Sequence, residues 1–325
     1  MTLNRRNFAT SAAALAALGL ARSVRAETYP SRAIKMVVPI SAGSATDVIG
    51  RLVAESLRAS LGQPVIVENR PGAGGSIGSA SVAKAPPDGY TLLTVSSAHT
   101  SNPALYSSLP YDTAREFNGI TMLATLPLIL VVAPSKNIRS VAELIALAKA
   151  KPGELTYSSS GVGSALHMGT EQFRAMAKFD AVHVPYRGTP EAMADVIAGR
   201  VDFAFLSVGN VLPAIRDGRL IALACGTDRR SRFLPDVPTT VEAGIPGSAY
   251  NAWVGLFVPT GTPSDVINIL NRATVKALQT PEIAEKFAAI GAEPAPMSAA
   301  DFDTYVAKEL KTIKELVRVA KIPIN

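Results

Sequence analysis

The chain has 325 residues, of which 48% are hydrophobic and 18% are charged, and this is the composition of a globular protein with one or two cores. It excludes intrinsic disorder and collagen-like repeats. The formal charge of +6 is concentrated at the start, because the first 26 residues contain Arg5, Arg6, Arg22 and Arg25 and no acid. Removing these four from the 32 basic residues leaves 28 against 26 acidic ones, which gives no support for a nucleic-acid-binding surface.

The first 26 residues have the organisation of an export signal. The pair Arg5-Arg6 precedes an apolar run over 12–21, and small residues up to Ala26 fit a cleavage site. This run is too short to span a bilayer, and no later segment reaches about 18 uninterrupted apolar residues. Because Phe8 follows the arginines closely, the segment resembles a twin-arginine signal, with an ordinary secretory signal as the alternative. We therefore expect a periplasmic protein.

Strand-like and helix-like runs alternate along the rest of the chain. Strands are expected at 34–40, 65–68, 90–95, 128–133, 155–158, 182–186, 201–206, 220–224 and 253–259. Helices are expected at 48–60, 76–84, 140–149, 165–178, 190–198, 264–278, 282–290 and 301–319, with a polar loop at 96–102 and a long connection at 228–246. This alternation predicts an α/β protein with mainly parallel sheets flanked by helices. A late return segment predicts two lobes with two crossovers: 27–125 plus 253–325, and 126–252.

Ser, Thr and Gly cluster repeatedly where an expected strand ends and the next helix begins. A helix N-terminus leaves backbone N–H groups unpaired and carries partial positive charge, which suits carboxylate, phosphate or sulfate. Ligands of open α/β sheets also gather at the carboxyl ends of the strands. Turn geometry alone explains any single loop of this kind. Their repetition is what indicates an anion site.

Three polar side chains next to these loops are site candidates with more than one interpretation. Asp47 is expected to position its loop, since its charge would repel an anion, unless the ligand carries an amine. His167 lies three residues after Ser164, and it either reaches the cleft or is a buried polar residue with its own partners. Arg187 either pairs with a ligand carboxylate or is an exposed arginine.

The sequence provides no clear catalytic or metal-binding constellation. The segment 74–78 matches the hydrolase pattern G-x-S-x-G, but Ser76 lies eight residues after Glu68, where the preceding strand ends. The histidines, His99, His167 and His183, lack metal-ligand spacing, and the single cysteine, Cys225, has no partner. The nucleotide-binding glycine motifs are also missing. We therefore expect no enzyme activity, no metal and no cofactor.

Six motifs carry a resemblance that covers nearly everything from Tyr29 to the C-terminus. They are VPISAGSATDVIGR (38–51), VIVENRPGAGGSIGSASVAKAPPDGYTLL (65–93), YSSSGVGSALHMGTEQF (157–173), VPYRGTPEAMADVIAGRVDFAF (184–205), VPTTVEAGIPG (237–247) and GLFVPTGTP (255–263). With these motifs in this order, the chain resembles the periplasmic solute receptors of tripartite tricarboxylate transporters, the Bug or TctC family. Two departures are Ser44, where the family usually has a second glycine, and Arg187, where lysine is common.

The resemblance implies a two-lobed Venus-flytrap receptor that closes around a small carboxylate and presents it to a membrane permease. The implied ligand contacts in the first lobe are Ser41, Ala42, Gly43, Ser44, Ala45, Ser96 and Ser97, and those in the second are Ser160, Gly161, Gly163, Ser164, Gly188, Thr189 and Phe205. Aromatic acids, aliphatic acids, nicotinate-like molecules and amino acids all remain open as ligands. We expect a monomer without a nucleic-acid partner. The alternatives are a ligand-sensing partner of a membrane signalling protein and an exported serine hydrolase that uses Ser76.

Overall fold

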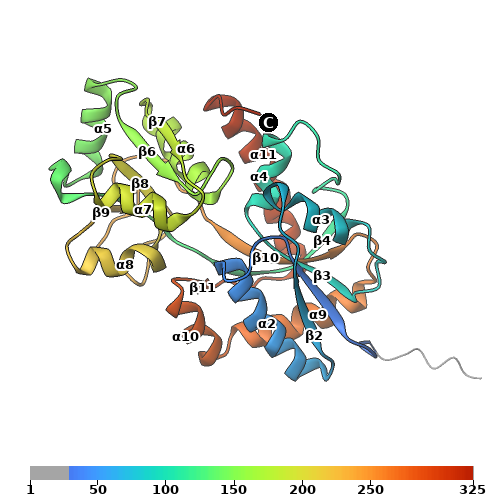
Figure 1. Cartoon of the computed structure of the whole chain (residues 1–325). Coiled ribbons are helices and arrows are strands. Elements are labelled where there is room, and N and C mark those ends of the chain that lie inside the picture. Colours follow the sequence, from blue (N-terminus) through green and yellow to red (C-terminus); the bar gives the residue numbers. More distant parts are fainter. Residues whose placement is uncertain (1–28, 325) are drawn as a thin grey trace, which may run out of the picture. The chain divides into compact units, whose positions relative to one another are not determined.

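The computed structural model describes residues 29–324, so the expected export signal at 1–26 lies outside the described residues. The chain from Arg32 onward forms one compact unit that contains two sheets (Figure 1). In the part of the chain that the structure describes, no helix is both long and apolar enough to cross a bilayer.

The first lobe is built on a six-stranded sheet with the order β11-β4-β10-β3-β1-β2. Its strands are β1 (Ile34–Val38), β2 (Val65–Asn69), β3 (Thr91–Ser96), β4 (Phe117–Thr125), β10 (Trp253–Pro259) and β11 (Glu293–Pro294). Its helices are α2 (Ala45–Leu61), α3 (Ser76–Ala83), α4 (Ala98–Leu105), α9 (Ser264–Leu278), α10 (Pro281–Ala289) and α11 (Ala299–Val319), with a short 3₁₀ turn η1 (Ala73–Gly75). Residues from both ends of the chain therefore share this sheet.

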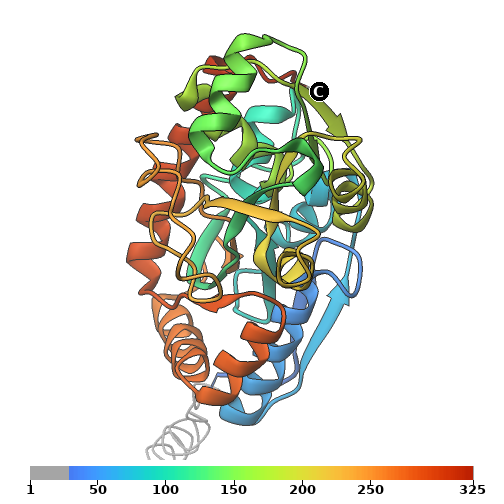
Figure 2. The same cartoon turned by 90° about the vertical axis from the view of Figure 1, so that its left-hand side faces the viewer.

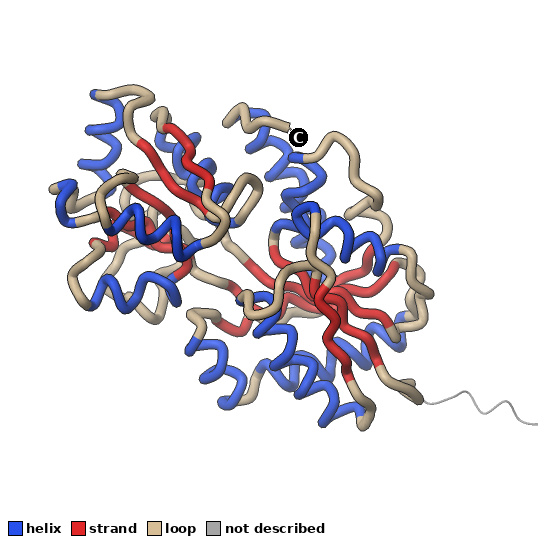
Figure 3. Tube along the Cα trace, viewed as in Figure 1, coloured by secondary structure: helices blue, strands red, loops and turns tan. Residues whose placement is uncertain are grey.

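The second lobe is built on a five-stranded sheet with the order β7-β6-β8-β5-β9. Its strands are β5 (Leu128–Val132), β6 (Thr156–Ser159), β7 (Val182–Pro185), β8 (Phe203–Ser207) and β9 (Ile221–Cys225). Its helices are α5 (Val141–Ala150), α6 (Ala165–Ala177), α7 (Thr189–Ile197) and α8 (Val208–Arg216), with a 3₁₀ turn η2 (Pro134–Lys136). Figure 3 shows the strands as two separate groups with helices around each, and the predicted two-lobed α/β fold is confirmed.

Both sheets are mixed, which corrects the expectation of mainly parallel sheets. Strand β1 pairs in parallel with β2 and β3, and β6 pairs in parallel with β7 and β8. Strands β10 and β5 instead run antiparallel to both of their neighbours, β3 and β4 in one sheet and β8 and β9 in the other. Each of these two strands enters its sheet from the other lobe, so no βα crossover within the sheet imposes a parallel direction on it.

Two connections join the lobes, as the sequence predicts. The first is the short link between β4 and β5, and the second runs from β9 to β10. They lie side by side, because the backbone N–H of Leu126 donates to the carbonyl of Ala252 at 2.8 Å. The first link also contacts the second lobe, where the N–H of Val208 donates to the carbonyl of Pro127 at 2.9 Å. The hydrogen bond between Leu126 and Ala252 keeps both connections at the edge where the Ser- and Gly-rich loops of the two sheets lie.

Helix α4 replaces the polar loop that was expected at 96–102, and strand β4 was not expected at all. The α4 sequence, AHTSNPAL, is poor in strong helix formers, yet His99, Thr100, Ser101 and Asn102 are all buried in the fold. Helix α4 packs on α11, and the hydroxyl of Thr100 donates to a carboxylate oxygen of Glu309 at 2.7 Å. Tertiary packing therefore stabilises a helix that local propensity does not favour.

The core of the first lobe is aromatic. Trp253, Phe257 and Phe302 lie together, with the Phe257 and Phe302 ring centroids 4.9 Å apart. A Cβ atom at Gly255 would collide with the Phe302 ring, so the absence of a side chain there lets α11 approach β10 closely. Burying one such side chain contributes about 1.5–3 kcal/mol. Figure 2 shows the long helix α11, in red, running along this lobe, and its packing against α6 also links it to the second lobe.

Candidate functional site: an anion pocket between the lobes

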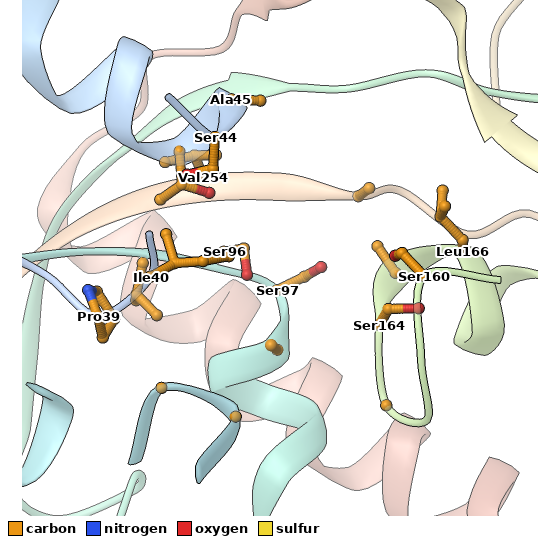
Figure 4. A pocket seen from close by; sticks show the side chains of 18 of the residues that line it. Pro39, Ile40, Ser44, Ala45, Ser96, Ser97, Ser160, Ser164, Leu166 and Val254 are labelled. Atoms are coloured by element: carbon orange, nitrogen blue, oxygen red, sulfur yellow. The ribbon is translucent and has the colours of Figure 1, made fainter. Parts of the chain in front are cut away.

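A pocket of about 430 Å³ lies where the two sheets turn their loops toward each other. From the first lobe it is lined by Ser41, Ser44, Ala45, Ser96 and Ser97, and from the second by Ser160, Gly163, Ser164 and Thr189. Figure 4 shows the side chains of Ser44, Ser96 and Ser97 on one side of this space and those of Ser160 and Ser164 on the other. These segments follow β1, β3, β6 and β7, so loops after four different strands meet in one place.

Helices from both lobes begin at the pocket. The N-cap residues of α2, α3, α4, α6 and α8 line it, namely Ser44, Gly75, Ser97, Ser164 and Ser207, and so does Thr189, the first residue of α7. Each helix start brings unpaired backbone N–H groups and the positive end of a helix dipole. The pocket is therefore suited to a negatively charged group on each side.

Neutral residues alone line the pocket. Among the described residues, no Asp, Glu, Lys, Arg or His belongs to the lining, while Leu128, Leu166 and Trp253 give it apolar walls. Ile40 and Val162, also in the lining, are 41% and 47% exposed although they are large and hydrophobic. A ligand here meets N–H dipoles and hydroxyls at its polar ends and hydrocarbon along its body.

Asp47 organises the first-lobe loop from behind the pocket. One oxygen of its buried carboxylate accepts the backbone N–H of Gly43 at 2.9 Å and Nε of Arg51 at 3.0 Å. The other oxygen accepts Nδ2 of Asn69 at 2.8 Å. Burial alone would raise the pKa of Asp47, but hydrogen bonds from Arg51, Gly43 and Asn69 outweigh it, so the pKa is lowered. An ionised Asp47 thus holds the loop that ends at Ser44.

The second-lobe loop has a similar construction. Gly161 and Gly163 have φ of +112° and +79°, and a side chain is strained at such angles. The carbonyl of Gly161 accepts Oγ of Ser164 at 2.7 Å, and Oγ of Ser164 accepts the N–H of His167 at 3.3 Å. These contacts shape the loop so that α6 begins facing the pocket.

His167 is a buried residue with its own partners. Its Nδ1 accepts the backbone N–H of Gly163 at 3.2 Å, and its ring stacks on that of His183 with centroids 4.2 Å apart. His183 in turn lies 2.7 Å from Oγ of Ser159 through its Nε2. Burial, with a smaller effect from the neighbouring His183, lowers the pKa of His167 to about 4. The neutral ring therefore supports the loop from below and does not enter the pocket.

A second buried carboxyl group lies behind the start of α4. Glu309 accepts hydrogen bonds from Oγ1 of Thr100 at 2.7 Å and from Nε1 of Trp253 at 2.8 Å. Burial raises the pKa of Glu309 to about 7, although these hydrogen bonds and one from Tyr305 act in the opposite direction. Nearby, Oγ of Ser97 is buried at the pocket without a protein partner among the described residues. Burial raises the pKa of the Tyr250 side chain and the Ser97 hydroxyl acts in the opposite direction, so bonding of that hydroxyl to a ligand stays a prediction.

The sequence-predicted residues divide into two groups in the structure. Those in the lining are Ser41, Ser44, Ala45, Ser96, Ser97, Ser160, Gly163, Ser164 and Thr189, and those outside it are Ala42, Gly43, Asp47, Gly161, His167, Arg187, Gly188 and Phe205. Phe205 lies in the second-lobe core, where its ring packs edge-on against Phe173 at 5.6 Å. Arg187 is exposed. Each binding role stays a prediction.

Several lining residues were missed by the sequence interpretation. Gly72, Gly74 and Gly75 belong to the glycine-rich loop after β2, and the carbonyl of Gly74 accepts Nδ2 of Asn102 at 3.0 Å. Asn102, Tyr106 and Trp253 also line the pocket. The glycine run was a visible signal. Trp253 had none, because its position depends on the return of the chain from the second lobe.

The hydrolase pattern does not form a catalytic site. Ser76 is the buried first residue of α3, and it lies outside the pocket lining. Over residues 29–324, no group of three or more His, Cys, Asp or Glu side chains is arranged to hold a metal ion.

Comparison with known proteins agrees with this architecture. The family model described as "Tripartite tricarboxylate transporter family receptor" matches residues 49–322. The protein BugT of Bordetella pertussis is 38% identical over 306 residues, which cover 94% of each chain.

Solved structures share both the sequence and the fold. Rpa4515 of R. palustris, solved with adipate, is 33% identical, with a TM-score of 0.80 over 91% of this chain and 100% of that one. MatC of Rhodopseudomonas palustris, solved with bound malate, is 30% identical, with a TM-score of 0.76 over 89% of this chain and 100% of that one. The chain therefore belongs to the family of tripartite tricarboxylate transporter receptors, which are periplasmic solute-binding proteins and not enzymes.

Proposed function

We propose that this protein binds a small carboxylate in the pocket between its lobes and delivers it to a membrane permease of the tripartite tricarboxylate type. The observation that carries the proposal is the meeting of helix N-termini from both lobes at a pocket without charged side chains. Such a pocket compensates a carboxylate through N–H dipoles and hydroxyl groups, so it needs no arginine or lysine. The contacts proposed are the serines, Gly163 and Thr189 in the lining.

The proposed ligand is an acid without an amino group. An ammonium group in the pocket would need a carboxylate partner, and no acidic side chain lines it among the described residues. Asp47 does not supply one, because its oxygens accept Gly43, Arg51 and Asn69. The neighbours solved with adipate and malate support acids of this kind.

The proposed mechanism is closure of two domains, 27–125 plus 253–325 and 126–252, around the acid. A ligand that touches both domains stabilises the closed state by its higher affinity for that state. The paired connections at Leu126 and Ala252 are the proposed hinge. The proposed route to the periplasm is export through the segment 1–26 by the twin-arginine pathway.

A thermal-shift screen tests the ligand class. Purified protein is heated with malate, succinate, adipate, benzoate and terephthalate, and in parallel with aspartate, glutamate and the amides of the same acids. A ligand that binds the folded state at 100 times its Kd stabilises it by about 2.7 kcal/mol. We expect at least one acid to raise the melting temperature while its amide and the amino acids do not.

Ser97→Ala and Ser164→Ala are the variants that connect the ligand to this pocket. Each removes one hydroxyl group from the lining, and Ser298→Ala removes the N-cap hydroxyl of α11, which lies outside the pocket. We expect the pocket variants to weaken the acid at least fivefold and the control to leave its affinity unchanged. Stabilisation by amides as strong as that by acids would contradict the anion pocket.

A further inference from the structure

A groove of about 1070 Å³ runs along one side of the C-terminal helix α11. Its opposite wall is formed by α4 and the loop that follows it, with Pro103, Tyr106, Leu109 and Tyr111 in the lining. On the α11 side, Leu310, Val317, Ile322 and Ile324 line it beside charged residues, and Ile324 is 63% exposed. Among these apolar residues, Tyr111, Val317 and Ile322 are buried, whereas Pro103 and Ile324 are exposed along the groove.

One edge of the groove carries a row of basic residues. Lys311, Lys314, Arg318 and Lys321 line it, and their spacing of three or four residues places those on α11 along one face of the helix. Arg318 pairs with Glu315. Lys311, Lys314 and Lys321 have no ion pair among residues 29–324, which leaves three uncompensated positive charges on this edge.

Acidic residues of the groove do not neutralise these lysines. Glu315 is engaged by Arg318, and Asp112 on the opposite wall is paired with Arg115 at 3.7 Å. Since the chain after residue 26 is close to neutral overall, the positive row is a local feature and not part of a generally basic surface. A local excess of one charge beside an apolar groove is typical of an interaction site.

We propose that this groove docks an acidic amphipathic peptide segment of the membrane permease, an inference that rests on the proposed function. Apolar side chains of the segment pack on the groove floor, and its carboxylates pair with Lys311, Lys314 and Lys321. Residues 1–28 of this chain are unsuited as the occupant, because they contain four arginines and only one acid, Glu27. A flat lipid surface would leave a hollow of about 1070 Å³ unfilled.

The groove also adjoins the ligand pocket. Tyr106 lines both spaces, and a side chain at Gly74 of the pocket would meet the hydroxyl oxygen of Tyr106 at 2.7 Å. A segment that packs on Tyr106 from the groove therefore lies one side chain away from the bound acid. This position suits a partner that receives the ligand.

The test compares two triple variants with the same change in charge. Lys311→Glu, Lys314→Glu and Lys321→Glu reverse the groove row, while Lys84→Glu, Lys149→Glu and Lys276→Glu reverse three exposed lysines elsewhere that are also without an ion pair among the described residues. Labelled proteins are incubated with right-side-out inner-membrane vesicles of the native host, intact or stripped of surface protein by protease. Vesicles of phosphatidylethanolamine and phosphatidylglycerol are the lipid reference.

We expect the groove variant to bind intact host vesicles at least tenfold more weakly than wild type, and the control variant to bind like wild type. Protease treatment should abolish wild-type binding, and the pure lipid vesicles should bind no protein. Equal binding by the groove variant, or absent binding by wild type, overturns the proposal. Wild-type binding to pure lipid would assign the groove to a membrane surface, and a wild-type dimer that the groove variant loses in sedimentation would assign it to a second copy.

Circular dichroism and the acid panel are measured on the same proteins. Acid-induced stabilisation that persists in the groove variant shows that its pocket is intact, so lost vesicle binding belongs to the groove. A wild type that no acid stabilises contradicts the proposed function instead, and the two failures remain distinguishable.

Discussion

Replacing Asp47 by asparagine should loosen the first-lobe loop without removing any pocket residue. The carboxylate accepts Gly43, Arg51 and Asn69 through its two oxygens, whereas an amide has a single oxygen. Its NH₂ group must then face a donor, either Nδ2 of Asn69 or the Gly43 N–H and Arg51. A lost hydrogen bond to a charged group costs about 1.5–3 kcal/mol. The remaining hydrogen bonds also become weaker, because their acceptor is then a neutral amide and not a carboxylate. We expect a total loss of about 3 kcal/mol in the free energy of unfolding.

Asp301→Asn is a closely matched control. Asp47 and Asp301 are each the third residue of a helix, and each donates its backbone N–H to an N-cap serine, Ser44 or Ser298. Both therefore interact similarly with the helix dipole, which is worth about 0.3–1 kcal/mol. Asp301 is exposed and its carboxylate accepts the Ser298 hydroxyl, so its replacement should cost no more than this amount. The difference between the variants measures the loop contacts of Asp47.

Urea unfolding at pH 7, followed by circular dichroism, gives both free energies. The folded-state pKa of Asp47 is lowered, so its contribution is complete above the unfolded pKa near 3.9 and is lost as the pH falls through the folded pKa. At pH 7 the whole contribution is measured. Calorimetry with the acid from the screen should show at least tenfold weaker binding by Asp47→Asn. A loss within about 0.5 kcal/mol of that of Asp301→Asn, with unchanged affinity, would refute this explanation of the loop.

Three further predictions concern the second-lobe loop and the buried titratable groups. Gly163→Ala should cost about 1–2 kcal/mol and weaken the acid, because φ is +79° and the new Cβ would meet Cδ1 of Leu105 at 2.8 Å; unfolding and calorimetry measure both effects. Because the pKa of His167 is lowered to about 4, its stabilising contribution is present above pH 6.5 and is lost as the pH falls toward 4. His167→Asn should therefore flatten the pH dependence of the free energy of unfolding between pH 4 and pH 6.5. An unchanged slope of that free energy against pH would count against the prediction. Because the pKa of Glu309 is raised to about 7, its contribution to stability is present below pH 4.5 and is lost as the pH rises to 7. Glu309→Gln should therefore become more stable relative to wild type between pH 5 and pH 8, by on the order of 2 kcal/mol. The same difference between variant and wild type at both pH values would contradict this prediction.

Local patterns in the sequence predicted much of the fold. The runs that became β1, β2, β3 and β10 are apolar and bounded by turn residues. The capped helices α2, α6 and α11 each have an N-cap serine whose Oγ accepts a backbone N–H three residues later. These signals depend on neighbours within a few residues, so they are readable without the fold. The serine and glycine loops were found for the same reason.

Tertiary structure decided what depends on residues far apart in the chain. Helix α4 exists where Thr100 reaches Glu309, 209 positions away, and strand β4 is defined by pairing with β10. Strand direction in the mixed sheets follows from the crossovers between lobes and leaves no local trace.

The division of the predicted site residues has the same origin. The sequence predicted Ser44 and Ser164 in the right loops and His167 in the helix that follows. Asp47 was expected at the end of its loop but lies in the first turn of α2. The sequence predicted that Asp47 positions its loop, which the hydrogen bond from Gly43 confirms, but it left His167 open between the pocket and the loop, because that depends on which atoms the folded neighbours present. The hydrogen bonds from Gly43 to Asp47 and from Gly163 to His167 each join residues four positions apart. Asp47 and His167 make these bonds, and do not line the pocket, because strands and helices distant in the chain bury their side chains.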